Sequence, residues 1–219
     1  MNNHFVTELA HLRRNLCRQG VSVHQVIQEA IRAFRTGDVE LAQRVISQDN
    51  VIDGEEIRIE EECLKILALY QPVAGDLRTV ISCIKINSSL ERMADFAAHM
   101  AERAIHLANL TTLQEYERFN FEPMAALVQD MLHDVLQVID TGDIMLAHKI
   151  IERDDAVDAM RSEHRCHARG AIVAYPFAAE YYIDCIGVAR DLERIADLAT
   201  DICQQIIYLR TGCITRHKC

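Results

Sequence analysis

Apolar residues recur at intervals of three and four along most of the chain, which is the spacing of one buried helix face. Clear runs are Leu41, Val45 and Ile46, then Ile59, Cys63, Ile66 and Leu67. The pattern breaks at residues 36–38, 71–72, 109–123, 141–143, 175–176 and 211–212, leaving six long segments. The sequence therefore predicts an all-α protein of six helices, the second from about 38 to 70 and on the order of 50 Å long.

The composition supports a helical fold. Half of the 219 residues are hydrophobic, and only 8 Gly and 3 Pro are present, too few turn formers for many short strands. No apolar run approaches the roughly 20 residues that span a bilayer. The amino terminus lacks the apolar stretch of a secretion signal, so we expect a cytoplasmic protein without membrane insertion.

The net charge of the chain limits the kinds of molecule that it can bind. The formal net charge is −10, which disfavours nucleic acid and anionic lipid surfaces and suits cations or basic protein surfaces. The eight cysteines include no C-x-x-C pair. We expect them to behave mostly as small buried hydrophobes rather than as zinc ligands or disulfides.

The breaks carry helix-ending chemistry. Each Thr-Gly-Asp, at 36–38 and 141–143, places Gly where one helix stops and Asp where the next is capped. Each proline is expected in the first turn of a helix, where its missing N–H costs nothing.

The order of these signals is repeated. Residues 36–42 (TGDVELA) match residues 141–147 (TGDIMLA), and residues 90–97 (LERMADFA) match residues 192–199 (LERIADLA). The chain is thus two copies of a unit of about 105 residues. This predicts two tandem, similar three-helix bundles, residues 1–110 and 111–219, with the polar stretch 111–115 as the connector.

The repeat contains one motif four times, an acid followed four residues later by Asp. The pairs are Asp49/Asp53, Glu91/Asp95, Asp154/Asp158 and Glu193/Asp197. Residues four apart share a helix face, where two like charges repel. Hard cations such as Mg²⁺, Mn²⁺ or iron prefer carboxylate oxygens and would offset that repulsion. The pattern therefore predicts metal sites between neighbouring helices.

Further residues extend these faces unequally. His99 follows Asp95 by four residues and Asp201 follows Asp197, and both offer donor atoms. Glu56 and Glu60 extend the first-half face, whereas their counterparts are Arg161 and Arg165, so the two sites are predicted to differ. A single acid pair is usually solvated surface, and Arg92 and Arg194 could neutralise the acids instead. Recurrence at matched positions favours metal.

A second motif, QPVAGDLR at residues 71–78, opens the third segment. Its plain interpretation is a helix start, with Asp76 at the positive end of the helix dipole and Arg78 pairing locally. The second half keeps the proline but loses the arginine. Gln71, Asp76 and Arg78 are therefore predicted to form a contact surface particular to the first half.

The sequence contains few of the motifs that known catalytic sites require. A ferritin-like di-iron site needs two Glu-x-x-His motifs, and only Glu8 with His11 fits. Glycine-rich phosphate loops, nucleophile elbows and zinc-protease histidine pairs are absent. The histidine-rich stretch 164–167 is predicted to be polar helix surface. Two alternatives stay open, a di-metal oxidase or hydrolase that uses the same carboxylates and a scaffold with merely solvated acids.

Together these motifs resemble the PhoU family of phosphate-specific transport system accessory proteins. The resemblance rests on the two three-helix repeats, the acid-x-x-x-Asp motifs, the Gln-Pro-x-x-x-Asp-Leu-Arg opening and the repeated Leu-Glu-Arg-x-x-Asp, and it covers essentially the whole chain. Ala94 and Ala196 stand where Gly often precedes the motif's Asp, and His99 stands where Asn or Asp is frequent.

The resemblance implies a cytoplasmic, non-enzymatic regulator that is usually a homodimer. Such proteins repress the phosphate regulon, restrain phosphate uptake and link the ABC phosphate transporter, through its ATPase subunit, to the sensor histidine kinase. It also implies metal ions (iron, manganese, magnesium or zinc) on the acid-x-x-x-Asp faces. These map to Asp49, Asp53, Glu91, Asp95, Asp154, Asp158, Glu193 and Asp197.

Overall fold

The computed structural model describes residues 3–110 and 116–213. Its helices are α1 (Asn3–Thr36), α2 (Val39–Tyr70), α3 (Ala74–Ala108), α4 (Glu122–Thr141), α5 (Ile144–Ala174) and α6 (Ala179–Thr211), with a 3₁₀ turn η1 (Pro176–Ala178) before α6. The all-α prediction is confirmed, and α2 covers almost the range expected for the second helix. The predicted connector 111–115 lies outside the described residues.

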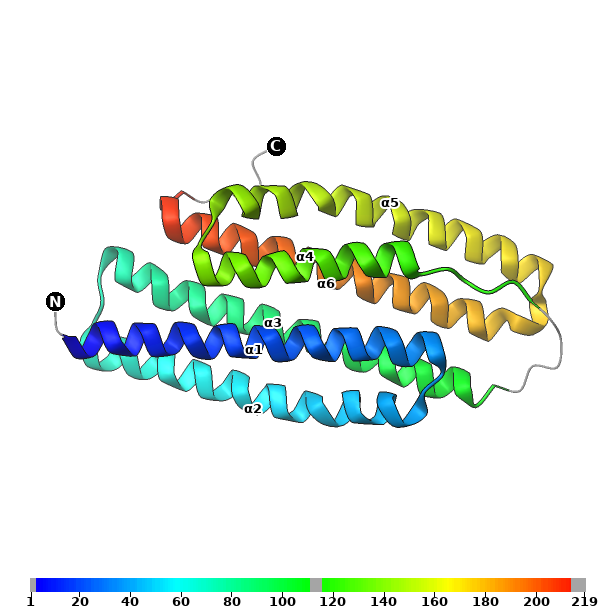
Figure 1. Cartoon of the computed structure of the whole chain (residues 1–219), viewed down its shortest axis with the longest axis horizontal. Helices are drawn as coiled ribbons and strands as arrows, with labels where there is room; N and C mark the ends of the chain where they lie inside the picture. Colours follow the sequence, from blue (N-terminus) through cyan, green and yellow to red (C-terminus); the bar gives the residue numbers. More distant parts are fainter. Residues whose placement is uncertain (1–2, 111–115, 214–219) are drawn as a thin grey trace.

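The helices form two three-helix bundles, α1–α3 and α4–α6, as the repeat predicts. The two bundles lie side by side, with α2 and α5 at opposite edges (Figure 1). Across the middle, α3 packs against α6 and α1 against α4. No helix in the described ranges combines the length and apolarity needed to cross a membrane.

Local capping explains why the two inner turns are placed where they are. Gly37 and Gly142 adopt left-handed backbone angles, with φ of 67° and 69°, which glycine accepts without a steric penalty. The Asp38 carboxylate then accepts a hydrogen bond from the Leu41 amide at 2.9 Å. Asp143 caps α5 in the same way. Both Thr-Gly-Asp predictions are confirmed.

The proline prediction holds at two sites and is wrong at the third. Pro123 lies in the first turn of α4, and Pro176 begins η1. Pro72 instead lies between two residues in the left-handed region, Gln71 (φ 44°) and Ala74 (φ 47°). The Gln71 amide closes α2 by donating to the Leu67 carbonyl, and Pro72 falls in the turn because α3 starts only at Ala74.

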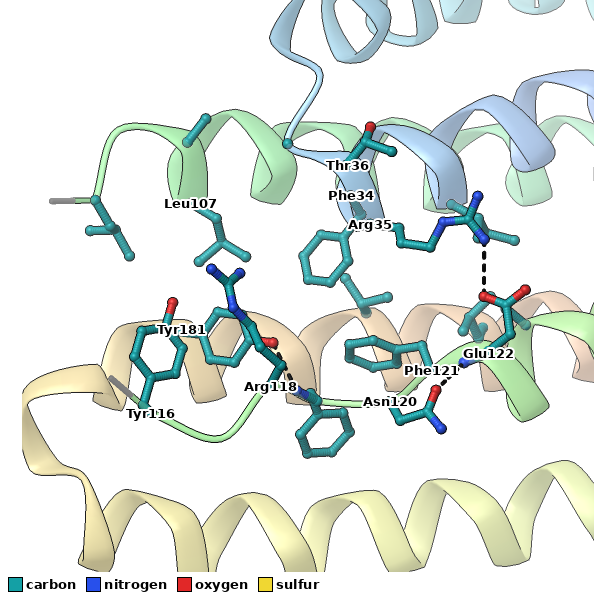
Figure 2. A pocket seen from close by; sticks show the side chains of 18 residues that line it. Phe34, Arg35, Thr36, Leu107, Tyr116, Arg118, Asn120, Phe121, Glu122 and Tyr181 are labelled. Carbon is teal, nitrogen blue, oxygen red and sulfur yellow. Dashed lines mark hydrogen bonds and ion pairs between the residues drawn. The ribbon is translucent and has the colours of Figure 1, made fainter. Parts of the chain in front are cut away.

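The segment 116–121 crosses the second bundle beside α6 (Figure 2). The Tyr181 hydroxyl accepts a hydrogen bond from the Phe119 amide at 2.9 Å. Phe119 is buried, and its ring lies 5.2 Å from the His167 ring and 4.9 Å from the His164 ring. The prediction of polar helix surface holds at the exposed residues 165–167 and is wrong at His164, which is half-buried against an aromatic residue from a distant segment.

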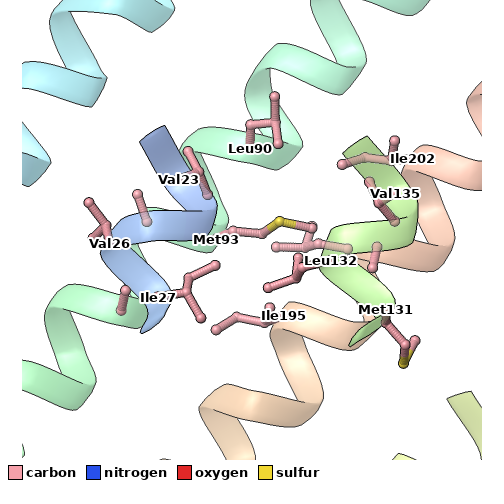
Figure 3. Packing of buried hydrophobic residues seen from close by; sticks show 14 of the residues in the cluster. Val23, Val26, Ile27, Leu90, Met93, Met131, Leu132, Val135, Ile195 and Ile202 are labelled. Carbon is pink, nitrogen blue, oxygen red and sulfur yellow. The ribbon is translucent and has the colours of Figure 1, made fainter. Parts of the chain in front are cut away.

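One hydrophobic core runs through both bundles. Val23 of α1, Met93 of α3, Leu132 of α4 and Ile195 of α6 belong to the same buried cluster (Figure 3). Met93 and Ile195 occupy equivalent places in the two Leu-Glu-Arg-x-x-Asp motifs. The apolar side of each motif thus builds the core between the bundles, which leaves its acids on another side of the helix.

The described cysteines are free, and Cys63, Cys83, Cys185 and Cys203 are buried. Burial raises the pKa of the Cys63 thiol to about 12, so it stays protonated and packs as a small hydrophobe. The prediction of small buried hydrophobes is confirmed at these four positions.

Candidate metal centre

The first acidic face consists of Asp49 and Asp53 on α2 and Glu91 and Asp95 on α3. Because α2 and α3 form an antiparallel pair, the middle of one helix meets the middle of the other. One carboxylate oxygen from each of Asp49, Asp53 and Asp95 lies within 4.8 Å of the other two. The structure therefore brings together three of the four acids that the sequence singles out here.

These carboxylates raise one another's proton affinity. Burial, and then the charges of Asp53 and Asp95, raise the pKa of Asp49. Burial, and next the charge of Asp95, raise the pKa of Glu91 to about 7. One oxygen of Asp49 is buried without a hydrogen-bond partner. The face thus carries more negative charge than its own hydrogen bonds can balance.

His99 and Glu56, which the sequence predicts at the edge of this face, change the pKa values of its acids. His99 lies close enough that its charge lowers the pKa of both Asp49 and Asp95, against the raising effect of burial. The negative charge of Glu56 also raises the pKa of Glu91. The acid stripe on α2 therefore continues past Asp53, as predicted.

The second acidic face consists of Asp154 and Asp158 on α5 and Glu193 and Asp197 on α6. Burial, followed by the charges of Asp197 and Asp158, raises the pKa of Asp154 to about 6. Asp201 is near enough to raise the pKa of Asp197, although burial is the largest cause. The repeat thus brings matching acids together in both bundles.

Arginines distinguish the second face from the first. The Arg161 Nε lies 3.3 Å from a Glu193 oxygen, and the Arg194 Nη1 lies 3.2 Å from an Asp197 oxygen. Arg161 occupies the repeat position of Glu56. The predicted difference between the two faces is therefore visible as two internal ion pairs. Arg194 pairs with an acid of its own helix, α6, rather than with one on a neighbouring helix.

The first face fits a hard cation. Oxygen ligands lie about 2.0–2.6 Å from Mg²⁺ or Ca²⁺, so oxygens within 4.8 Å of one another can share one ion. Three carboxylates with an adjacent imidazole suit magnesium, manganese or iron more closely than a thiolate-preferring metal. Within the described residues, this is the trio of ligand atoms found at that spacing. An ion on the second face would first have to displace an arginine.

The motif at residues 71–78 lies at the turn between α2 and α3. Gln71 is exposed and Asp76 is half-buried. Arg78 forms no ion pair with Asp76 or any other described residue. A Cβ built at Gly212, just after α6, would lie 3.8 Å from the Arg78 guanidinium carbon. The arginine thus extends towards the second bundle rather than pairing locally.

A buried ion pair that the sequence analysis did not identify joins the two bundles. The fully buried Asp191 of α6 lies 2.5 Å from Arg103 of α3. A Cβ at Gly187 would lie 2.3 Å from the Arg103 Nε, so the glycine leaves space for the arginine. One signal was available, because Asp191 interrupts the apolar positions Val188 and Leu192.

Comparisons with known proteins agree with this architecture. A sequence model of the PhoU domain matches residues 16–104 and 121–206, one match in each bundle. The phosphate-specific transport system accessory protein PhoU homolog of Aquifex aeolicus is 37% identical over 211 residues, covering 96% of this chain and 95% of that protein. PhoU homolog 1 of Thermotoga maritima is 31% identical over 216 residues, covering 95% and 90%.

Solved structures give the same result. The crystal structure of PhoU from Pseudomonas aeruginosa matches with a TM-score of 0.90 at 34% identity, covering 95% of this chain and all of that one. The phosphate transport system regulatory protein PhoU from Streptococcus pneumoniae matches with a TM-score of 0.88 at 28% identity, covering 96% and 99%. These names describe accessory and regulatory proteins and give the di-metal enzyme alternative no support. With matches in both bundles and over nearly its whole length, the chain belongs to the PhoU family.

Proposed function

We propose that this protein is a negative regulator of the phosphate regulon that also modulates phosphate uptake. In this role it links the ATPase subunit of the ABC phosphate transporter to the sensor histidine kinase. The observation that carries the proposal is the end-to-end similarity to proteins named phosphate-specific transport system accessory protein PhoU, 37% identical over 96% of the chain in one case.

The proposed mechanism is binding rather than catalysis. A partner shifts a conformational equilibrium only by binding one state more tightly than the other. We propose that the protein binds preferentially to the phosphatase-competent state of the kinase, which keeps the regulon off while the transporter is supplied. This makes the chain a non-enzymatic module that works in the cytoplasm, without nucleic acid and without insertion into a membrane.

The turn between α2 and α3 is the proposed partner surface. Next to Gln71, Asp76 and Arg78, the side chains of Val73 and Leu77 are 74% and 40% exposed. Apolar side chains grouped with charged ones at an exposed turn are a common composition for a protein interface. This supports the contact surface predicted from the sequence for the first half.

The first acidic face is the proposed cation site. Asp49, Asp53 and Asp95 would hold the ion, with Glu91 and His99 beside them. The bound cation would offset the repulsion among these carboxylates and so stiffen the α2–α3 pair. The second face, with its arginine pairs, would bind a cation more weakly.

Expression in a strain that lacks its own PhoU protein tests the regulatory role. Such a strain is expected to express alkaline phosphatase in phosphate-rich medium, and this chain is expected to restore repression. Val73→Asp places a charge on the proposed partner surface and should abolish restoration. Val173→Asp is the matched control, because Val173 is 81% exposed on α5 of the other bundle. Failure of the unaltered chain to repress would contradict the proposal.

Two further measurements test the remaining parts of the proposal. Light scattering of the purified protein should give the mass of a homodimer, and a monomer would contradict the oligomeric state. Metal-loaded protein should neither consume oxygen nor hydrolyse phosphate esters. Turnover in either assay, lost in Asp95→Asn, would favour the di-metal enzyme instead.

A further inference from the structure

A cavity of about 1040 Å³ lies where the two bundles meet segment 116–121 (Figure 2). The end of α1 and the end of α3 form one side, while segment 116–121 and the start of α6 form the other. Small-molecule sites in proteins occupy roughly 300–1000 Å³. The cavity is therefore large enough for a ligand of several rings or a ring with a charged group.

Two pairs of aromatic rings line this cavity. The Phe34 and Phe121 ring centroids are 5.5 Å apart, and those of Tyr116 and Tyr181 are 4.9 Å apart. Each pair joins segments that are distant in sequence, and Figure 2 shows all four rings around the same space. Aromatic side chains in such positions bind planar rings by stacking or edge contacts.

One arginine in the cavity has no carboxylate partner. The Arg118 guanidinium lies 5.3 Å from the centre of the Tyr116 ring and 5.8 Å from that of Tyr181. In Figure 2 its side chain extends from segment 116–121 across the cavity towards Leu107 of α3. Arg118 is exposed and forms no ion pair with a described residue, so its donors are available to a ligand.

A second arginine lies on the other side of the cavity. The Arg35 Nη1 lies 3.0 Å from a Glu122 oxygen, and both side chains are more than half exposed. Exposed ion pairs are weak, so an anionic ligand can compete for this guanidinium. Arginine is the side chain best suited to phosphate, because its planar guanidinium can donate two parallel hydrogen bonds.

We infer that this cavity binds a small anionic ligand with a planar ring, of the nucleotide class. The base would lie among the rings of Phe34, Phe121, Tyr116 and Tyr181, and the unpaired Arg118 would contact the phosphates. Such a ligand touches α1 and α3 of the first bundle together with α6 of the second. The inference stands on the cavity alone and does not depend on the proposed regulatory role.

Calorimetric titration of the full chain with ADP and UDP tests this site. EDTA is included so that no nucleotide is held through a cation at the first acidic face. At least one nucleotide is expected to bind, and adenosine and inorganic phosphate should each bind at least tenfold more weakly, because each provides only half of the recognised chemistry. The same ligand should raise the melting temperature.

Variants place the ligand in the cavity. Arg118→Ala should weaken nucleotide binding about tenfold, Arg118→Lys should weaken it less, and Phe34→Leu should weaken binding through lost ring contacts. Arg14→Ala is the matched control, since Arg14 is exposed on the opposite half of α1. Arg118 is exposed, so circular dichroism should show that its variants fold normally.

Four results would overturn the inference. If neither nucleotide binds at millimolar concentration, the cavity is not a nucleotide site. If Arg118→Ala leaves the affinity unchanged, the nucleotide binds elsewhere. Equal affinity for adenosine removes the anionic requirement. Equal affinity for inorganic phosphate removes the ring requirement.

Discussion

Removing one charge from the first acidic face should stabilise the metal-free protein. Asp95→Asn keeps the shape of the side chain and deletes its charge. In the folded chain Asp95 lies within 4.8 Å of carboxylate oxygens of both Asp49 and Asp53. In the unfolded chain, Asp95 is 42 or more residues away from either acid, so this repulsion is specific to the folded state.

The magnitude follows from Coulomb's law. Two unit charges 4.8 Å apart repel by about 1 kcal/mol in the dielectric of water, and the half-buried face makes this a lower bound for each of the two contacts. The wild-type protein relieves part of the repulsion by binding protons, since the pKa values of Asp49, Asp95 and Glu91 are raised. The net gain expected for Asp95→Asn is about 1 kcal/mol at pH 8.

The stability that Asp95→Asn gains over wild type should grow as pH rises. Groups whose pKa is raised on folding bind more protons in the folded state, so the free energy of unfolding falls as pH rises through their folded pKa. For Glu91 that pKa is about 7. Wild-type protein should therefore lose stability between about pH 5 and 8, and the advantage of Asp95→Asn should shrink towards pH 5.

Urea unfolding in EDTA at about pH 5 and pH 8 measures the difference in stability between wild type and Asp95→Asn. With Mn²⁺ in place of EDTA, the wild type should become the more stable of the two. A cation present at 100 times its dissociation constant adds about 2.7 kcal/mol to the protein that binds it, and the variant lacks a ligand. Asp197→Asn is the matched control, because Asp197 already pairs with Arg194 and its neutralisation should give no gain. A metal-free Asp95→Asn that is less stable than wild type at pH 8 would refute the reasoning.

Three further predictions concern the rest of the fold. Arg103→Ala should lower the free energy of unfolding by about 1–3 kcal/mol, because the buried Asp191 then keeps only its longer ion pair with Arg190, at 3.7 Å, and Asp191→Asn in the same chain should recover part of the loss; equal stability of the variant and the wild type in urea unfolding would contradict this. Asp143→Ala should cost about 1 kcal/mol through loss of the α5 cap, with an unchanged urea midpoint as the contrary result. The hydrogen bond from His106 to Asp184 at 2.6 Å raises the pKa of His106, so its stabilisation is present at low pH and is lost as pH rises through that pKa; His106→Gln should remove this pH dependence, and an unchanged stability profile would contradict it.

The features that could be predicted from the sequence are those set by neighbours along the chain. Gly37 and Asp38 end one helix and begin the next through contacts only a few residues long. The spacing of Asp49 and Asp53 fixes their shared face because four residues make about one helical turn. Because the second half repeats both motifs, the same two predictions apply to its helix cap and its acid pairs.

The features that could not be predicted depend on contacts between distant segments. Arg103 and Asp191 are 88 residues apart, and their pairing requires the exact placement of α3 against α6. Phe119 packs against the rings of His164 and His167 only because segment 116–121 turns along the second bundle. Helical periodicity describes one face of one helix and contains no information on which distant segment covers it.

Metal content tests the cation site on the first acidic face most directly. Wild-type protein, Asp95→Asn and Asp197→Asn are purified without chelator and analysed for iron, manganese, magnesium and zinc. We expect wild-type protein to contain bound metal, Asp95→Asn to lose most of it, and Asp197→Asn to retain the metal of the first face. Equal metal content in all three proteins would contradict a cation site there.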